Sequence, residues 1–109
     1  MNIDRNYDLV VTIVNHGDSD IVMDAAKEAG ATGGTVLTAR GLGSKEAEKF
    51  FGISIQPEKE VVLIVTKRDI KKTIMQSICK VAGLNTKASG ISFSLPIDDV
   101  LGIATFQEF

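Results

Sequence analysis

The two halves of the chain repeat one pattern of apolar and polar positions. Each half begins with a continuous apolar run rich in β-branched residues, at 9–14 in the first half and at 61–65 in the second. Runs of this kind are typical of strands buried on both faces. After a polar break, apolar residues recur at helical spacing over 21–29 and over 70–82. The pattern therefore predicts a strand followed by a helix in each half.

Polar residues mark the expected starts of both helices. Asp18 or Ser19 can cap the first helix, because a short side-chain oxygen there accepts a hydrogen bond from a free backbone N–H group. Before the second helix, Thr66 with Asp69 three residues later resembles a capping box. Both signals support the helices that the apolar spacing predicts.

A glycine and a further strand follow each predicted helix. Gly30 and Gly83 lie where a helix favours a left-handed residue at its end. The strands are expected over 34–39 and 91–97. Apolar residues alternate with Ser and Pro over the second range, which predicts a half-buried strand. Pro96 indicates a sheet edge or a strand end.

Strand, helix and strand thus occur twice in 109 residues, a length that fits a single domain over 1–109. This order predicts an α+β fold class, a ferredoxin-like βαββαβ sandwich in which one antiparallel sheet is covered by two helices. A short tail, 98–109, follows the last strand. Little of the chain remains to cover the second face of the sheet, so we expect the chain to oligomerise.

A long connection over about 40–59 separates the two halves. Connections of this length inside a compact domain are usually functional or disordered. Lys45 and Lys49 lie in it beside two adjacent aromatic residues, Phe50 and Phe51. These four residues form a candidate partner-docking patch. The alternative is that the aromatic pair folds back onto the base of the connection as a small apolar cluster.

The charge balance and the apolar runs exclude some classes of partner. Twelve Lys and Arg residues against 14 Asp and Glu residues give a net charge of −2, whereas a nucleic-acid binder needs a basic surface to neutralise phosphates. No apolar run approaches the length of a membrane span, so direct membrane insertion is not expected. A single cysteine excludes an internal disulfide and is typical of a reduced, cytoplasmic compartment.

The chain holds no constellation of residues that would catalyse a reaction or hold a metal. His16 is the only histidine and is expected at the surface or in a turn. Cys79 lies on the predicted second helix and is expected to be a small buried apolar residue. Asp98 and Asp99 are adjacent and are expected to begin the turn into the tail. We therefore expect neither an enzyme nor a required cofactor.

Pairs of glycines flank the second predicted strand. Gly33 and Gly34 precede it, and Gly41 and Gly43 follow it. Glycine lets the backbone approach a ligand closely and leaves N–H groups free to bind phosphate. The simpler interpretation is that Gly41 and Gly43 only begin a flexible loop, because a lone G-x-G is weak evidence for a phosphate site.

From Glu28 to Gly43 the chain reads Glu-Ala-Gly-Ala-Thr-Gly-Gly-Thr-Val-Leu-Thr-Ala-Arg-Gly-Leu-Gly. This segment resembles the end of the first helix, the second strand and the entry to the long T-loop of the nitrogen regulatory protein P-II family. The segments 61–65 and 89–97 follow in that family's order, and the resemblance covers about residues 8–103. It implies a ferredoxin-like homotrimer that binds adenine nucleotides in clefts between subunits. It also implies that the T-loop regulates an enzyme or a membrane transporter.

The resemblance implies particular contacts to the nucleotide. Gly33 and Thr35 would line the base end of the cleft, and Val65 would touch the base through its backbone. Gly41 and Gly43 would shape the root of the T-loop beside the phosphates. The protein would sense the nucleotide as a ligand and would not require it as a cofactor.

Two departures from the family bear on the phosphates. Gly90 would lie in a turn that faces the neighbouring subunit, but this turn reads Ala-Ser-Gly-Ile over 88–91 where the family has Gly-Asp-Gly-Lys. The tail 98–109 also lacks the arginines that the family places at the outer phosphates. Since charged contacts are the strong ones for phosphate, we expect AMP, cyclic AMP or ADP to bind in preference to ATP. Three cations could take over the missing contacts: Arg40, Lys45 and Lys87.

The long connection departs from the classical members as well. The only tyrosine is Tyr7, so the connection lacks the tyrosine that those members have modified. Lys45 stands where they have a glutamine that helps to hold magnesium and 2-oxoglutarate. The chain therefore resembles a PII-like regulator, not a classical nitrogen sensor. The alternatives are a structural or metal-handling trimer similar to the divalent-ion tolerance proteins, and a small enzyme on the same common fold.

Overall fold

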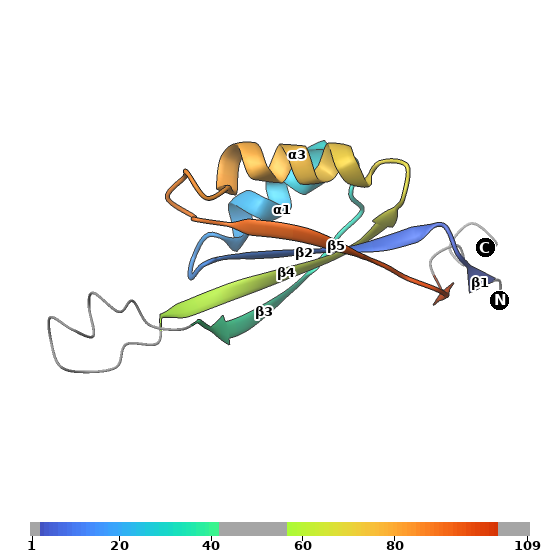
Figure 1. Ribbon diagram of the computed structural model, residues 1–109, viewed down its shortest axis with the longest axis horizontal. Helices are drawn as coiled ribbons and strands as arrows, with labels where there is room; N and C mark the ends of the chain where they lie inside the picture. Colours follow the sequence, from blue (N-terminus) through green and yellow to red (C-terminus); the bar gives the residue numbers. More distant parts are fainter. Residues whose placement is uncertain (1–2, 42–56, 103–109) are drawn as a thin grey trace, which may run out of the picture.

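The computed structural model describes residues 3–41 and 57–102, in which two helices cover one side of a four-stranded antiparallel sheet (Figure 1). The sheet has the order β3-β4-β2-β5, and its strands are β2 (Tyr7–Asn15), β3 (Thr35–Arg40), β4 (Glu58–Lys67) and β5 (Ile91–Pro96). The helices are α1 (Ser19–Glu28) and α3 (Lys71–Ala82). β4 pairs antiparallel with both β2 and β3, so these two strands run parallel with β4 between them. This is the ferredoxin-like α+β sandwich that the sequence predicts.

A second sheet consists of two short strands near the ends of the chain. β1 (Ile3–Asp4) pairs antiparallel with β6 (Val100–Leu101), which lies inside the expected tail. Arg5 Nε lies 2.9 Å from a carboxylate oxygen of Asp99. In Figure 1 this ribbon lies at the end of the molecule away from the C-terminal end of β3. The hydrophobic pattern does not predict this ribbon, because two residues are too few to show alternation.

The core lies between the helices and one face of the sheet. On β2 and β4, alternate residues turn toward the helices and are almost completely buried: Val10, Thr12, Val14, Val62 and Ile64. The helices contribute residues at helical spacing: Val22, Ala25 and Ala26 from α1, and Ile74, Ile78 and Ala82 from α3. Burial of this apolar surface, worth about 25 cal/mol per Å², is the main stabilising contribution to the fold.

The other face of the sheet is also apolar, and no described element covers it. The register places apolar residues in three rows across β4, β2 and β5: Val65, Leu9 and Leu95; Leu63, Val11 and Phe93; and Val61, Ile13 and Ile91. With Leu37 of β3, which pairs with Val61, these residues form what we call the open face. Five of its side chains are 40–53% exposed: Leu37, Val65, Ile91, Phe93 and Leu95. Contiguous exposed apolar surface of this kind is typical of an interaction site.

The alternation in β5 is present, but its apolar side is the exposed side of the single chain. Ser92 lies opposite Thr12 in the register, and the two hydroxyl oxygens are 2.8 Å apart. Ser92 and Ser94 therefore face the helices, whereas Phe93 faces outward. The expectation of a strand half-buried within one chain is wrong, because the register with β2 decides which side faces the helices. Pro96 ends this edge strand, as its missing N–H predicts.

The ends of α1 agree only in part with the predicted signals. Asp18 is the N-cap residue, but its side chain makes no capping hydrogen bond. Instead, the Glu60 carboxylate accepts a hydrogen bond from the Ser19 N–H at 3.0 Å. A residue of β4 thus caps this helix. Gly30 follows the helix with a φ of +114°, as predicted.

Both end signals predicted for the second helix are wrong. Thr66 is buried within β4, which continues one residue further, and α3 begins only at Lys71 with Ile70 as its N-cap. Gly83 has a φ of −68° and an extended backbone, not a left-handed one. A glycine still fits best there, because a Cβ atom would lie 2.6 Å from the Cys79 carbonyl oxygen. Within residues 3–41 and 57–102, no helix has the length and apolarity to cross a membrane.

Replacing Gly90 by alanine should destabilise the fold. The Gly90 N–H donates to the Ala82 carbonyl oxygen at 2.7 Å. An added Cβ would collide with that same oxygen and lie 2.9 Å from Val14 Cγ1. We expect Gly90→Ala to lower the free energy of unfolding by about 1–3 kcal/mol, measured by urea denaturation.

The matched control is Gly33→Ala, because no atom lies within 4 Å of the Cβ that it adds. This variant should change the free energy of unfolding by no more than about 0.5 kcal/mol. Equal denaturation midpoints for the two variants would contradict the close packing at Gly90.

Candidate functional site

A cavity of about 570 Å³ lies beside the connection from α1 to β3. Its walls are the backbone run 30–35, the C-terminal part of β4 and Tyr7 at the start of β2. Three of the predicted nucleotide contacts line it together: Gly33, Thr35 and Val65. The fold thus gathers the residues expected at the base end of the site, although they are up to 32 positions apart in the sequence (65 − 33).

Two adjacent glycines shape the wall of this cavity in different ways. A Cβ atom at Gly34 would lie 2.9 Å from Met23 Sδ and 3.1 Å from the Leu63 carbonyl oxygen. Gly34 therefore lets the chain pass closely between α1 and β4. At Gly33, no atom lies within 4 Å of an added Cβ, so this residue borders open space that a ligand can fill.

The remaining predicted contacts lie elsewhere in the chain. Gly41 follows β3, at the far end of that strand from Thr35, and its N–H donates to the Pro57 carbonyl oxygen at 3.0 Å. Gly90 precedes β5 at the opposite edge of the sheet. Three strand spacings separate β5 from β3, a distance of about 14 Å. One chain therefore does not bring Gly33, Gly41 and Gly90 together. The other predicted residues lie outside the described ranges: Gly43, Lys45, Lys49, Phe50 and Phe51.

Polar contacts join neighbouring loops at the end of the sheet where Gly41 lies. Asn15 Oδ1 accepts a hydrogen bond from Lys59 Nζ at 2.7 Å, and Asn15 Nδ2 donates to the Lys87 carbonyl oxygen at 3.1 Å. Arg40 occupies the last position of β3 at this same end. Two of the three cations that could replace the missing phosphate contacts, Arg40 and Lys87, are therefore at the end where the resemblance expects the phosphates.

His16 lies exposed near the same end, as expected for a lone histidine. Its Nδ1 atom is 3.5 Å from a carboxylate oxygen of Glu58 and from one of Glu60. Hydrogen bonds from the Ser19 side chain and from the Ser19 and Gly17 backbone hold the pKa of Glu60 below its usual value, although burial opposes them. Among the described residues, no group of three His, Cys, Asp or Glu side chains could hold a metal ion.

Cys79 is exposed, so the prediction that it is a small buried residue is wrong. The buried face of α3 holds Ile74, Ile78 and Ala82, at intervals of four residues. Cys79 follows Ile78 by one residue, which turns its side chain by about 100° from that face. The helical period, counted from Ile78, therefore places Cys79 at the border of the apolar stripe.

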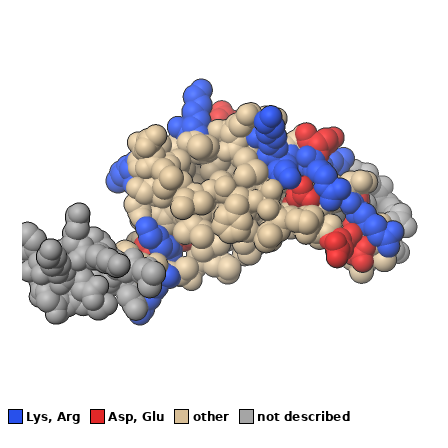
Figure 2. All heavy atoms as spheres, in the orientation of Figure 1, with Lys and Arg blue, Asp and Glu red and all other residues tan. Residues whose placement is uncertain are grey.

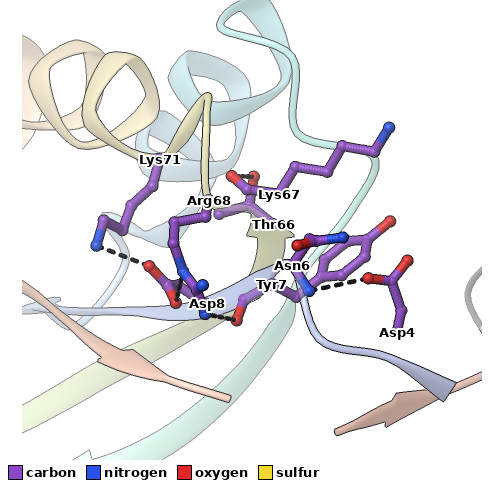
Figure 3. A network of polar contacts seen from close by, with 8 residues as sticks. All are labelled: Asp4, Asn6, Tyr7, Asp8, Thr66, Lys67, Arg68 and Lys71. Atoms are coloured by element: carbon purple, nitrogen blue, oxygen red, sulfur yellow. Dashed lines mark hydrogen bonds and ion pairs between the residues drawn. The ribbon is translucent and has the colours of Figure 1, made fainter. Parts of the chain in front are cut away.

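A buried carboxylate holds the turn between β4 and α3 (Figure 3). The Asp8 side chain is 3% exposed and accepts hydrogen bonds from Lys71 Nζ at 2.7 Å and from Arg68 Nε at 3.0 Å. The bond from Lys71, with the help of Arg68, holds the pKa of Asp8 below its usual value against the opposing effect of burial. Arg68 also donates to the Tyr7 carbonyl oxygen at 3.4 Å. Since Tyr7 lines the cavity, this network fixes one of its walls.

Nearly the whole chain matches one known family. The family model of nitrogen regulatory protein P-II matches residues 7–106. The chain belongs to the P-II family. The matched residues include both helices, the four strands of the main sheet and the 30–35 wall of the cavity.

Two solved structures are similar to this P-II protein. The crystal structure of Arabidopsis thaliana PII bound to citrate has 26% sequence identity and a TM-score of 0.66, and the match covers 94% of this chain and 84% of that one. A protein from Thermus thermophilus, described as PII-like and signaling, has 17% identity and a TM-score of 0.68, with 92% of each chain covered. The second likeness shows the shared fold alone.

Asp8→Asn should destabilise the protein more at neutral pH than at acidic pH. A carboxylate with a lowered pKa in the folded state stabilises the fold above its unfolded pKa, at about pH 4. This contribution disappears as the pH falls through the folded pKa. We therefore expect a lower urea midpoint for Asp8→Asn than for wild type at pH 7, and a smaller difference below about pH 3.

The control for this measurement is Asp99→Asn. Asp99 pairs with Arg5, but both side chains are more than half exposed, so their ion pair contributes little to stability. Asp99→Asn should therefore follow wild type at both pH values. A destabilisation by Asp8→Asn that does not change with pH would contradict the role of the Asp8 charge.

Proposed function

We propose that this protein is a PII-like regulator: a homotrimer that senses an adenine nucleotide in clefts between its subunits and controls a partner enzyme or membrane transporter through residues 40–59. The observation that carries the proposal is the cavity that Gly33, Thr35 and Val65 line together, where the resemblance expects the base. The proposal assigns regulation and not catalysis, and no required cofactor. It places the protein in the cytoplasm, without nucleic acid as a partner and without insertion into the membrane.

The open face is the argument for the trimer. In a single chain its apolar rows would stay in water, and burial of such surface is the main driving force for association. Members of the P-II family are generally trimeric, which supplies the number of subunits. Three sheets that turn their open faces inward make a closed assembly in which every copy uses the same surface.

The positions of the glycines support a site between subunits. Gly33 and Gly41 flank β3 at one edge of the sheet, and Gly90 precedes β5 at the other edge. In a ring of identical chains, head-to-tail contact brings one edge of each copy to the other edge of its neighbour. Gly90 of one copy then approaches the β3 glycines of the next, as a nucleotide site between subunits requires.

The donors around the cleft favour nucleotides with few phosphates. At the base end, contacts to a ligand would come largely from backbone atoms and from the fit of the cavity wall. Lys67 is the single cation among the described residues that line the cavity. The family's lysine is replaced by Ile91, the first residue of β5, which is apolar and 53% exposed. With few charged contacts for outer phosphates, AMP, cyclic AMP or ADP should bind in preference to ATP. The citrate bound to Arabidopsis thaliana PII supports the binding of small molecules by this fold.

The partner is proposed to bind at the connection between β3 and β4. Its predicted docking patch, Lys45, Lys49, Phe50 and Phe51, includes two adjacent aromatic residues, a residue class enriched at protein interfaces. The connection starts from the end of the sheet that holds Arg40, where the resemblance expects the phosphates. A nucleotide and a partner would therefore act at the same end of the molecule.

Leu95→Glu should break the trimer. Leu95 is 49% exposed on the open face, and a carboxylate there would be buried without a partner in the assembly. In light scattering at micromolar concentration, we expect a trimer for wild type and a monomer for Leu95→Glu. Leu84→Glu is the matched control and should remain trimeric, because Leu84 is 66% exposed and lies outside the sheet, just after α3. A wild-type chain that is a stable monomer would contradict the proposed assembly.

Titration calorimetry should show that AMP and ADP bind more tightly than ATP. Each missing charged contact to phosphate removes on the order of 1.5–3 kcal/mol of binding free energy. The loss of several such contacts should therefore weaken binding by more than about tenfold for each added phosphate. Tightest binding by ATP would contradict this argument, and no binding by any of the three would remove the nucleotide interpretation.

A leucine at Gly33 should block the site without disturbing the fold. The open space around Gly33 accepts the side chain, which then fills part of the cavity. We expect Gly33→Leu to weaken AMP binding by about tenfold or more in the same titration. Thr38→Leu, on the same edge strand but outside the cavity, is the matched control. Equal AMP affinities for the two variants would place the site elsewhere.

A further inference from the structure

A second cavity, of about 430 Å³, lies between α3 and the edge strand β5. No residue lines both this cavity and the one beside 30–35. It exists because β5 presents the small Ser92 to the helices, where the central strands β2 and β4 present mainly Val and Ile. Figure 2 shows the molecule from the side of β5. The middle of this face is largely uncharged, and charged side chains lie at its two ends and along its upper edge.

The walls of the cavity are mainly apolar, and the sheet contributes one polar pair to them. Met75, Ile78 and Ala82 line it from α3. Thr12 and Ser92 line it from the sheet, with their hydroxyl oxygens 2.8 Å apart. One hydrogen bond between two hydroxyl groups uses one of their two protons, so the pair can donate the other proton to a further acceptor. Thr12 is only 1% exposed and Ser92 is half-buried, and both line the cavity, so a ligand there can accept that proton.

Two lysines from the first turn of α3 also line the cavity. Lys71 is already paired with Asp8. Lys72 is exposed, and none of the ion pairs within residues 3–41 and 57–102 involves it. The N-terminal end of the helix adds a partial positive charge near these lysines. An anionic group in this cavity would therefore find an O–H donor and an unpaired ammonium group.

From these features we infer that the cavity between α3 and β5 binds a small apolar carboxylate, of the class of medium-chain fatty acids. The carboxylate oxygens accept hydrogen bonds from the Thr12–Ser92 pair and from Lys72, and the apolar body packs against Met75 and Ile78. The volume lies near the lower end of the range for small-ligand sites, about 300–1,000 Å³, which suits a chain of the size of octanoate. Gly90, which the proposed function assigns to the nucleotide site, also lines this cavity, but none of the side chains assigned here to the carboxylate belongs to the nucleotide site.

Octanoate is the probe for this site, and Cys79 is the reporter. Cys79 is exposed, lines the cavity and is the single cysteine of the chain, so its alkylation by iodoacetamide can be followed from the mass of the intact protein. We expect octanoate to slow the alkylation in a saturable manner, with a Kd of about 1 mM or below. At ten times the Kd, the rate should fall by about tenfold. Acetate, which has the carboxylate without the apolar body, should not slow it.

Two pairs of variants locate the ligand. Ser92→Leu fills the cavity and should abolish the protection by octanoate, whereas Ser94→Leu, on the same side of β5 but outside the cavity, should retain it. Lys72→Gln should weaken octanoate binding by up to about fivefold, because an exposed charge contact is lost. Lys80→Gln, on the same helix and outside the cavity, should leave the affinity unchanged.

Three results would overturn the inference. The first is an alkylation rate that does not change at about 10 mM octanoate. The second is equal protection of wild type and Ser92→Leu. The third is a Cys79 that reacts only after denaturation, which would mean that another part of the assembly fills the cavity. If Ser92→Leu does not fold, the wild-type titration and the comparison of Lys72→Gln with Lys80→Gln still test whether octanoate binds in this cavity. Nucleotide titration is a separate measurement, so failure of the proposed function and failure of this site are distinguishable.

Discussion

The antiparallel pairing of β2 with β4 determines where the other described elements lie. Nine residue pairs, from Tyr7 opposite Lys67 to Asn15 opposite Lys59, hold these central strands together. Because side chains alternate along a strand, a shift by one residue would exchange the two faces of the sheet. Both faces are apolar here, so hydrophobic burial alone specifies the register weakly. The polar contacts at the two ends of β2 supply the missing specification: Asp8 with Lys71 at one end, and Asn15 with Lys59 at the other.

The apolar pattern predicts the four main strands and both helices because each is long enough to show its period. It fails where the outcome depends on contacts between distant residues. Ser92 faces the helices because it pairs with Thr12. From the sequence alone, the apolar side of β5 would be expected to face the helices instead. Thr66 resembles a helix cap in the sequence, yet pairing with Asp8 keeps it in β4. Gly83 is favoured because a side chain there would collide with the Cys79 carbonyl oxygen, and the sequence pattern does not show this close contact.

The candidate site, too, could be predicted only as far as it does not depend on contacts between distant residues. The resemblance selects Gly33, Thr35 and Val65, and the fold places all three around one cavity. The separation of Gly41 from Gly90 depends on the strand order, which only the folded sheet reveals. The network around Asp8 gave no signal in the sequence. A carboxylate just before an apolar run looks like a solvent-exposed residue, and its partners Arg68 and Lys71 lie 60 and 63 positions away.

The ribbon of β1 and β6 brings the two ends of the described chain together. Ile3 lies opposite Leu101, whereas Arg40 and Glu58 lie opposite each other at the end of the β3–β4 pairing. In topological terms, the path through the described residues is a loop with its ends in contact. A circularly permuted chain, closed through β1 and β6 and opened between β3 and β4, would keep every strand pair of both sheets. The linear order of the elements is therefore one of several ways to thread the same arrangement in space.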